Sequence, residues 1–204
     1  MLRYWLFVTA EFLTACSHPQ ATGSRVYLAK GNISLILPDS SLIYSKLFLW
    51  GADYHLGSYG EAGAFYHNAD SSVRISVYVK AFPDPLQSTV PWHIIADEKR
   101  QRQELSARNW GLATIEAYRA DSVSRTIEMD YHLAKQQEKG WRGQVSYSKS
   151  FTIYGPNRTI DIQLTGPDNA LIRQQFAALQ ASVHVNASYL RAAAKLYPER
   201  EYQE

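Results

Sequence analysis

The sequence predicts an α+β domain, in which helices pack on a bent antiparallel sheet. After Arg25, apolar and polar residues alternate along much of the chain. This alternation is typical of strands that have one solvent-exposed face. Two segments instead repeat apolar residues at helical spacing, and the order of elements is strands, helix, strands, helix. With 204 residues, of which 46% are hydrophobic and 20% charged, the chain is long enough for one domain with a real core.

The strands follow from this alternation. Segment 32–50 predicts two strands that are separated at Pro38-Asp39-Ser40. Four later segments place most of their apolar side chains on one face, namely 72–80, 125–133, 143–155 and 158–164. Between the last two segments, Gly155-Pro156-Asn157 has the residue types of a hairpin turn, so these two strands are expected to pair.

A first helix is expected from Pro91 to Asn109. Proline suits the first turn of a helix, and the early Asp97 and Glu98 with the late Arg108 match the helix dipole. The apolar side of this helix is thin and consists of Trp92, Ile94, Ile95 and Leu105. We therefore expect it to lie over the sheet with much of its surface exposed.

A second helix is expected after Gly166-Pro167, with Asp168 or Asn169 as its N-cap. Its apolar residues are spaced for one helical stripe and consist of Leu171, Ile172, Phe176, Leu179 and Val183. A third, short helix is expected over residues 187–196, and the charged tail that follows is expected to be mobile.

The N-terminus has the organisation of an export signal. Arg3 precedes the apolar stretch 4–10, which is followed by Glu11 and is shorter than the roughly 20 residues of a membrane-spanning helix. The next residues, Leu13, Thr14, Ala15 and Cys16, resemble the cleavage site of a bacterial lipoprotein signal. Cys16 is the only cysteine, so no disulfide or cysteine-based metal site can form within one chain. The alternative is a buried N-terminal helix with an incidental cysteine.

This resemblance implies that Cys16 becomes the lipidated first residue of the mature protein, which carries palmitate-type acyl chains. More than one acyl chain gives stable attachment to a membrane. Ser17, a residue other than Asp after the lipid site, implies export to the outer membrane, where the chain would face the periplasm; the inner membrane is the alternative. Residues 16–24 are expected to form a polar tether.

Three segments of the remaining chain share the element order of a known group. They are the opening strand GNISLILP, the strand SVRISVYV before the first helix, and the finish TIDIQLTGPDNALIRQQFAALQASV. With these segments, residues 25–185 resemble the Mog1/PsbP-like group, which includes bacterial lipoproteins of the DcrB type. The resemblance implies a sandwich of a bent sheet and helices. The expected organisation is a signal peptide (1–15), a tether (16–24), the α+β domain (25–185), and a short helix with a tail (186–204).

No catalytic motif is assembled in the sequence. Ser146-Tyr147-Ser148-Lys149 matches the S-x-x-K of penicillin-interacting serine enzymes, but a strand places Ser146 and Lys149 on opposite faces. Gly57, Gly60 and Gly63 lack the spacing of a phosphate-binding loop and are expected in a hairpin or flexible loop. We therefore expect no catalytic residue and no cofactor.

The six histidines have no close metal-type spacing, so we expect no metal site. A zinc site assembled from distant histidines is the alternative. Two pairs of an aspartate and a histidine are spaced two residues apart, so each pair shares a strand face and could form an ion pair. They are Asp53 with His55 and Asp130 with His132.

Aromatic residues mark the first place to look for a partner surface. Tyrosine and tryptophan are enriched at interfaces because they combine a large contact area with a polar group. Five aromatic residues lie in one stretch, which we expect to be rich in loops. They are Trp50, Tyr54, Tyr59, Phe65 and Tyr66. The alternative is that they pack beneath the bent sheet.

Three roles fit these features. We expect a membrane-anchored envelope lipoprotein with a non-catalytic domain that binds a periplasmic or envelope protein. One alternative is an immunity protein that neutralises a periplasm-directed toxin, and the other is a ligand-binding enzyme with a histidine-containing pocket. The formal charge of +2, with basic and acidic residues intermixed, argues against a nucleic-acid partner.

Overall fold

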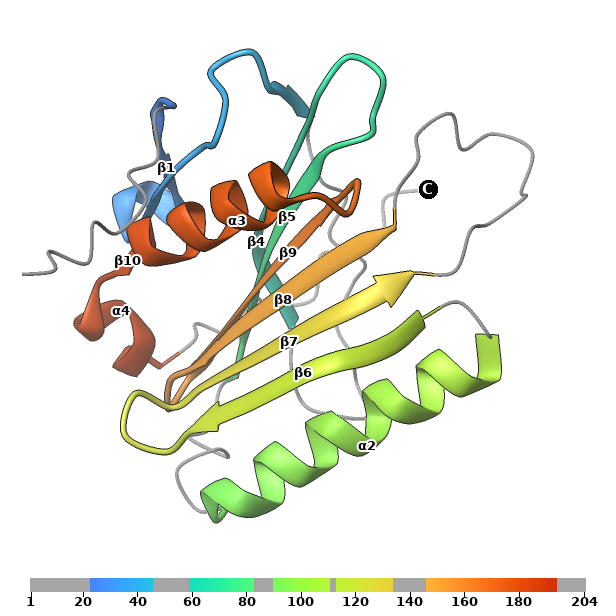
Figure 1. The fold of residues 1–204 in the computed structure, drawn as a ribbon. Coiled ribbons are helices and arrows are strands. Elements are labelled where there is room, and N and C mark those ends of the chain that lie inside the picture. The colour runs from blue at the N-terminus through green and yellow to red at the C-terminus, as the bar shows by residue number, and fades with distance from the viewer. Residues whose placement is uncertain (1–22, 46–58, 83–89, 111–112, 134–145, 194–204) are drawn as a thin grey trace, which may run out of the picture.

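The computed structural model describes residues 23–45, 59–82, 90–110, 113–133 and 146–193, and it is a mixed α+β structure. Its main sheet has seven antiparallel strands in the order β3-β4-β5-β9-β8-β7-β6 (Figure 1). The strands are β3 (Ile43–Ser45), β4 (Tyr59–His67), β5 (Arg74–Ala81), β6 (Ala113–Asp121), β7 (Thr126–Leu133), β8 (Tyr147–Tyr154) and β9 (Arg158–Gly166).

A smaller antiparallel sheet has the order β1-β2-β10. Its strands are β1 (Arg25–Leu28), β2 (Ile33–Ile36) and β10 (His184–Val185), and the short 3-10 turn η1 (Ala29–Gly31) joins the first two. The helices are α2 (Trp92–Trp110), α3 (Ala170–Ser182) and α4 (Ala187–Arg191). None of these helices is long and apolar enough to cross a membrane, a finding limited to the ranges above.

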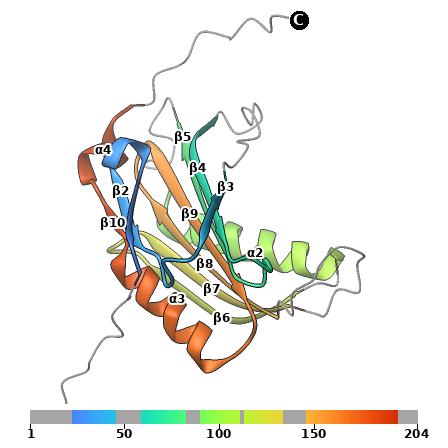
Figure 2. The same cartoon turned by 90° about the horizontal axis from the view of Figure 1, so that it is seen from above.

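The alternation of the central strands produces the main core. Ile75, Val77 and Val79 of β5 point to one side of the sheet, together with Ile160 and Ile162 of β9, because these strands pair in register. On that side α3 and the smaller sheet close the core, with Phe176 of α3 fully buried at its centre. Figure 2 shows α3 and the small sheet on one side of the twisted main sheet and α2 on the other.

Helix α2 covers a second, smaller core on the opposite side. Ala96 is buried there against Ile127 and Met129 of β7, and the Tyr118 hydroxyl of β6 donates a hydrogen bond to the Ala96 carbonyl oxygen at 2.8 Å. Of the expected apolar side, Trp92 and Ile95 pack against this core and Ile94 is exposed, while the Leu105 side chain lies outside the described part.

The β8–β9 hairpin forms at Gly155-Pro156-Asn157 as expected. The Gly155 amide donates to the Arg158 carbonyl oxygen at 2.8 Å, and a Cβ at position 155 would lie 2.7 Å from the Leu190 Cβ. Glycine is therefore required by the close approach of α4.

Helix α3 confirms one of the two proposed caps and corrects its stripe. Asn169 is the N-cap, and its side chain accepts a hydrogen bond from the Ile172 amide. Ile172, Phe176 and Leu179 are buried, whereas Leu171 is 62% exposed, contrary to expectation. Neighbouring helical residues point about 100° apart, so a stripe centred on Ile172 and Phe176 leaves Leu171 outside.

The third helix is shorter than the expected 187–196. It ends at Arg191, because Ala192 adopts an extended conformation. The Arg158 guanidinium binds the carbonyl oxygens of Tyr189 and Ala192, which fixes the chain at this point.

The prediction of a loop-rich stretch is wrong for residues 59–67. They form β4, with Gly60 and Gly63 inside the strand, where pairing with β5 outweighs the low strand preference of glycine. The alternation pattern also does not predict strands β1, β6 and β10. In β6 a bulge between Ile115 and Ala117 shifts the phase, so that Ile115 and Tyr118 pack on the same side although they are three residues apart.

Candidate functional site

A group of charged side chains gathers where β6, β7, β8 and the first turn of α3 meet, on the α3 side of the main sheet. We call it the charged cluster. It consists of Glu116, Glu128, Asp130, His132, Lys149, Asp168 and Arg173, together with the Tyr147 ring.

A β-bulge places Glu116 in this cluster. Ile115 pairs with Tyr131 and Ala117 pairs with Asp130, so Glu116 is the extra residue of β6. Bulges commonly redirect a side chain near functional sites. Here the bulge brings Glu116 to Arg173 of α3, at 3.0 Å between Oε2 and Nη2.

Arg173 joins the strands to the helix. Its Nε and Nη2 donate to the two carboxylate oxygens of Asp168 at 2.7 and 3.0 Å. The guanidinium also lies over the Tyr147 ring, 4.1 Å from its centroid. The hydrogen bonds from Arg173 lower the pKa of Asp168 below its usual value, so this carboxylate is held in its charged form.

Tyr147 connects this ion pair to a second one. Its ring is buried and stacks on Phe176, and its hydroxyl donates to Asp130 Oδ1 at 3.1 Å. Burial and the neighbouring Asp130 raise the Tyr147 pKa, which keeps the hydroxyl protonated. Lys149 Nζ lies 3.2 Å from the same Asp130 oxygen and 3.6 Å from Glu128 Oε2. The cluster is therefore one continuous network.

His132 lies at the open end of the network. Its Nδ1 is 3.9 Å from Glu116 Oε1 and 3.9 Å from Asp168 Oδ2, and its side chain is 52% exposed. The structure does not show the expected ion pair between Asp130 and His132. Asp130 instead accepts hydrogen bonds from Tyr147 and Lys149. The histidine and carboxylates that an enzyme site would need do converge, but they do so at the surface.

The same three residues have the donor types of a metal site. Ligand atoms of Glu116, His132 and Asp168 lie within 4.8 Å of one another, and all three residues are exposed. Arg173, however, already supplies a cation to both carboxylates. The arrangement is complete as an ion-pair network, and we assign no metal to it.

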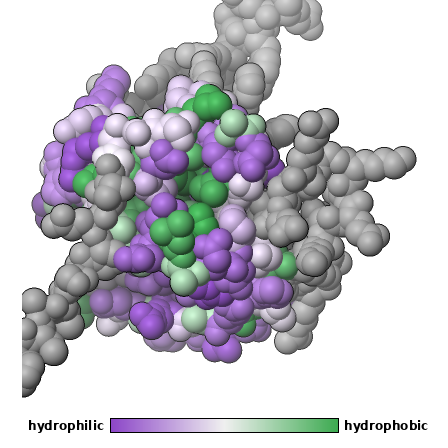
Figure 3. Space-filling view, turned by 45° about the horizontal axis from the view of Figure 1, so that its top comes forward, coloured by the Kyte–Doolittle hydropathy of each residue, from purple (hydrophilic) through white to green (hydrophobic). Residues whose placement is uncertain are grey.

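Hydrophilic residues cover most of the face that Figure 3 shows, and hydrophobic residues are exposed near its centre and upper edge. Among the described ranges, the strongest grouping of side chains with functional chemistry is the charged cluster.

The residues singled out in the sequence fall mostly elsewhere. Phe65 and Tyr66 of β4 point to opposite faces: Tyr66 is buried in the main core, and Phe65 is half-buried on the α2 side. The backbone of Tyr59 lies in β4, and its side chain is outside the described part. Also outside it are Leu13, Thr14, Ala15, Cys16, Trp50, Asp53, Tyr54, His55 and Gly57.

The S-x-x-K motif does not assemble a catalytic pair. The Ser146 hydroxyl oxygen accepts a hydrogen bond from the Asp168 amide at 2.9 Å, whereas Lys149 binds Asp130 and Glu128. Lys149 nevertheless belongs to the charged cluster, and Ser146 borders it through Asp168. Glu116 and Arg173 had no signal in the sequence, because a bulge and a contact between distant segments bring them together.

No family model and no curated protein matches the chain. Among solved structures it is similar to cyanobacterial PsbP (CyanoP) from Synechocystis sp. PCC 6803, with a TM-score of 0.52 at 12% identity over 80% of this chain and 92% of that one. The extracellular domain of PknH from Mycobacterium tuberculosis gives 0.39 at 12% identity, over 71% and 86% of the two chains. A protein from Bacteroides thetaiotaomicron VPI-5482 gives 0.34 at 10%, over 80% and 48%.

The likeness to CyanoP confirms the expected fold class. The chain has a Mog1/PsbP-like α+β fold, built from mostly antiparallel sheets with a few helices. At this identity the likeness concerns the fold alone, and function has to come from the site.

Proposed function

We propose that this chain is an envelope lipoprotein whose PsbP-like domain binds a protein partner through the charged cluster. Lipid on Cys16 would hold the domain at the periplasmic face of the outer membrane. The segment Leu13-Thr14-Ala15-Cys16 supports the anchor, since it resembles a lipoprotein cleavage site and contains the only cysteine.

The observation that carries the binding role is the organisation of the charged cluster. Its carboxylates, Glu116, Glu128, Asp130 and Asp168, outnumber its permanent cations, Lys149 and Arg173. The ion pairs hold these side chains in place before any partner arrives, which lowers the entropy cost of association. The excess negative charge is complementary to a basic segment on the partner and would steer its approach.

The pairing within the cluster also supports binding over catalysis. Arg173 holds Asp168 and Glu116, and Lys149 holds Asp130 and Glu128. Burial raises the pKa of the Tyr147 hydroxyl, which donates its proton to Asp130, so it is a poor acid and stays protonated instead of acting as a base. A catalytic acid or base needs a pKa near the working pH, whereas the pKa of Asp168 is lowered by Arg173 and the pKa of Tyr147 is raised by burial.

The anchor is tested by labelling growing cells with a palmitate analogue. We expect the label on the wild-type chain in the outer-membrane fraction and its loss in Cys16→Ser. Recovery of an unlabelled chain that still carries Met1 from the soluble cytosol would refute the anchored role.

The partner surface is tested by crosslinking in the envelope, followed by mass spectrometry. The double variant Glu116→Gln/Glu128→Gln removes two negative charges from the cluster, while Glu98→Gln removes one from the α2 surface as the control. We expect the double variant to lose the crosslinked partner and the control to keep it, and the complex to weaken as salt is raised. A partner retained equally by both variants would show that the cluster is not the binding surface.

A further inference from the structure

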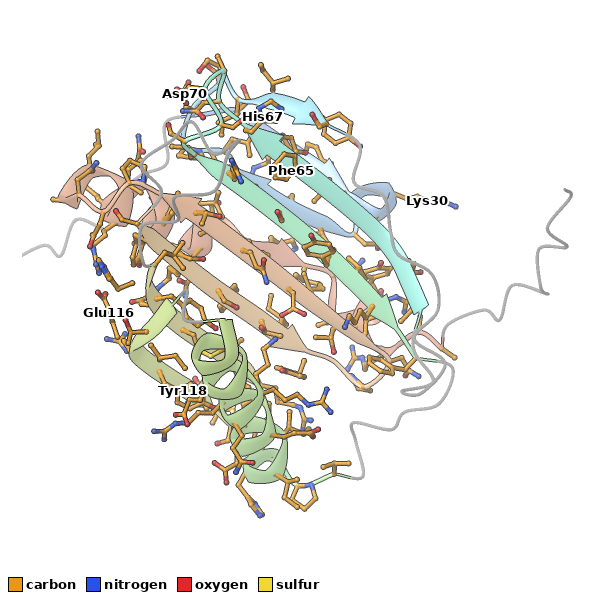
Figure 4. All side chains as sticks on the ribbon, turned by 90° about the vertical axis from the view of Figure 1, so that its right-hand side faces the viewer. Lys30, Phe65, His67, Asp70, Glu116 and Tyr118 are labelled. Atoms are coloured by element: carbon orange, nitrogen blue, oxygen red, sulfur yellow. The ribbon has the colours of Figure 1, made fainter. Side chains whose placement is uncertain are left out.

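Strand β6 forms one margin of the main sheet. It stands at the end of the strand order, and β7 is its only partner among the described strands. In Figure 4, Glu116 and Tyr118 lie at this margin beside α2. The margin is open to solvent past Tyr118, where Arg119, Ala120 and Asp121 are all exposed. An edge strand presents backbone amide and carbonyl groups with which another strand can pair.

The hydrogen-bond pattern of the sheet shows which backbone groups of β6 point outward. The Leu133 amide donates to the Ser146 carbonyl oxygen, so the odd-numbered residues of β7 bond to β8. In an antiparallel sheet the even-numbered residues of β7 then bond to β6, where they face the odd-numbered residues that follow the bulge. Tyr118 and Ala120 therefore direct their amide and carbonyl groups away from β7. These four groups form no hydrogen bond with another described segment.

The bulge at Glu116 limits the free edge to residues 117–121. The register shift between Ile115 and Ala117 interrupts regular pairing at that point. The five residues that follow, at about 3.4 Å each, give an edge of about 17 Å, which suits an added strand of ordinary length. Ala117 and Ala120 carry only a methyl group each, so their side chains leave room for a second backbone.

The charges along this edge alternate on the α3 side of the sheet. Tyr118 packs against the core under α2, so Ala117, Arg119 and Asp121 face the α3 side. Glu116 lies next to Ala117 and belongs to the charged cluster. The order of charge is therefore negative at Glu116, positive at Arg119 and negative at Asp121.

Two of these charges are open to a partner. Within the described part, Arg119 and Asp121 enter no ion pair. The amides of Val123 and Ser124 in the following turn donate to Asp121 and lower its pKa, which keeps the carboxylate charged. Opposite charges directly across two paired strands stabilise the pairing, and like charges weaken it. The edge therefore selects the order of charge on an added strand.

We infer that the partner's segment adds to β6 as an antiparallel strand past the bulge. The inference rests on the proposed function, since it states how a basic segment lies against the charged cluster. The backbone groups of Tyr118 and Ala120 exchange hydrogen bonds with the added strand. Its charged side chains are basic, acidic and basic at alternate positions, to match Glu116, Arg119 and Asp121 in turn. All strand pairs of the main sheet are antiparallel, and the added strand continues that pattern.

The inference is tested by NMR titration of the full-length, isotope-labelled protein in detergent. The probe is the capped peptide TKVEVKT, which carries the expected order of charge on one face. The control is TKVKVET, which has the same composition but places a lysine opposite Arg119. We expect TKVEVKT to shift the amide resonances of Tyr118 and Ala120 saturably and to bind about fivefold more tightly than the control. Saturation without a shift at Tyr118 and Ala120 would overturn the inference.

Methylation of the peptide nitrogens separates strand pairing from simple charge attraction. In the antiparallel register the two valines lie opposite Tyr118 and Ala120, so methyl groups on their nitrogens remove two hydrogen bonds to β6. We expect the affinity to fall at least tenfold. The lysine nitrogens point to solvent in this register, so their methylation should leave the affinity nearly unchanged. Equal binding of the two methylated peptides would overturn the inference.

The matching protein variant is Ala120→Pro, which removes an outward amide and leaves every charge of the charged cluster in place. Edge strands tolerate proline at such a position, and Ala120→Ser, which keeps the amide, is the control. We expect the proline variant to lose both the peptide and the crosslinked envelope partner, and the serine variant to keep them. The methylated peptides decide the question if the proline variant does not fold.

The envelope crosslinking separates this inference from the proposed function. Loss of the partner in Glu116→Gln/Glu128→Gln but not in a folded Ala120→Pro would overturn strand addition and leave the charged cluster as the binding surface. Retention of the partner by all of these variants would refute both.

Discussion

Glu61 of β4 and Arg158 of β9 form a bidentate ion pair. Arg158 Nε and Nη2 donate to the two oxygens of the Glu61 carboxylate at 2.5 and 2.9 Å. Tyr189 of α4 covers this pair, with its ring 4.2 Å from the guanidinium carbon and its hydroxyl donating to Glu61. The pair therefore fastens the C-terminal helix to the main sheet.

Glu61 and Glu116 each lie at a β-bulge. The register of β4 shifts between Gly60 and Ala62, which makes Glu61 the extra residue of a bulge, as Glu116 is in β6. Each bulge turns a glutamate toward an arginine of another element, Arg158 or Arg173. The Glu61–Arg158 pair has a buried arginine and holds a helix, whereas the Glu116–Arg173 pair is more exposed and belongs to the charged cluster.

Removal of the Arg158 side chain should strongly destabilise the fold. Arg158→Ala leaves the half-buried Glu61 without its partner and frees the carbonyl oxygens of Tyr189 and Ala192. We expect the free energy of unfolding, measured by urea denaturation, to fall by about 3 kcal/mol. Arg102→Ala breaks an exposed pair on α2 and should cost less than about 1 kcal/mol. Equal losses in the two variants would contradict the fastening role.

Stability should fall in acid, in part because of Glu61. Burial by itself would raise the Glu61 pKa, but the hydrogen bonds from Arg158 and Tyr189 outweigh it and lower the pKa below its usual value. A carboxyl with a lower pKa in the folded chain stabilises the fold above its unfolded pKa of about 4.3, and this contribution is lost as the pH falls through the folded pKa.

The test compares urea midpoints from about pH 7 down to about pH 2 for the wild type and Glu61→Gln. The variant should be less stable near neutral pH and should lose less stability on acidification. A pH dependence identical to that of the wild type would show that Glu61 has the same pKa in the folded and unfolded chain.

The Asn169 cap of α3 should contribute about 1 kcal/mol to the free energy of unfolding. Asn169→Ala removes the oxygen that accepts from the Ile172 amide at 2.9 Å, so the midpoint of thermal unfolding should drop. Asn169→Asp keeps a side-chain oxygen at this position and should restore most of the loss. Failure of aspartate to do better than alanine would mean that the cap does not stabilise the helix.

Ser150→Ala should stabilise the protein. The buried hydroxyl has no partner within the described ranges, so its removal should raise the free energy of unfolding by about 1 kcal/mol. Differential scanning calorimetry measures the change, with Ser76→Ala, half-buried on the same face of the sheet, as the matched control. A loss of stability in Ser150→Ala would indicate that the hydroxyl is satisfied in the fold.

The local patterns predicted much of the fold. Apolar residues two apart gave the correct faces of β5, β7 and β9, and the chemistry of Gly155-Pro156-Asn157 gave the correct hairpin. These features depend on neighbouring residues alone. The prediction failed for β6, where the bulge at Glu116 sets Ile115 and Tyr118 three residues apart on one side and conceals the period of two.

By itself, the sequence determined the fold class and the strands that flank the core, and it narrowed the cap of α3 to Asp168 or Asn169, because alternation, helical spacing and capping are properties of short segments. Only the tertiary structure decided which side chains meet. The strand order β5-β9-β8-β7-β6 brings together residues far apart in the chain, so the charged cluster exists only once these strands have paired. Glu116 reaches Arg173 across 57 positions, and Lys99 reaches Asp161 across 62, distances over which no local pattern carries information.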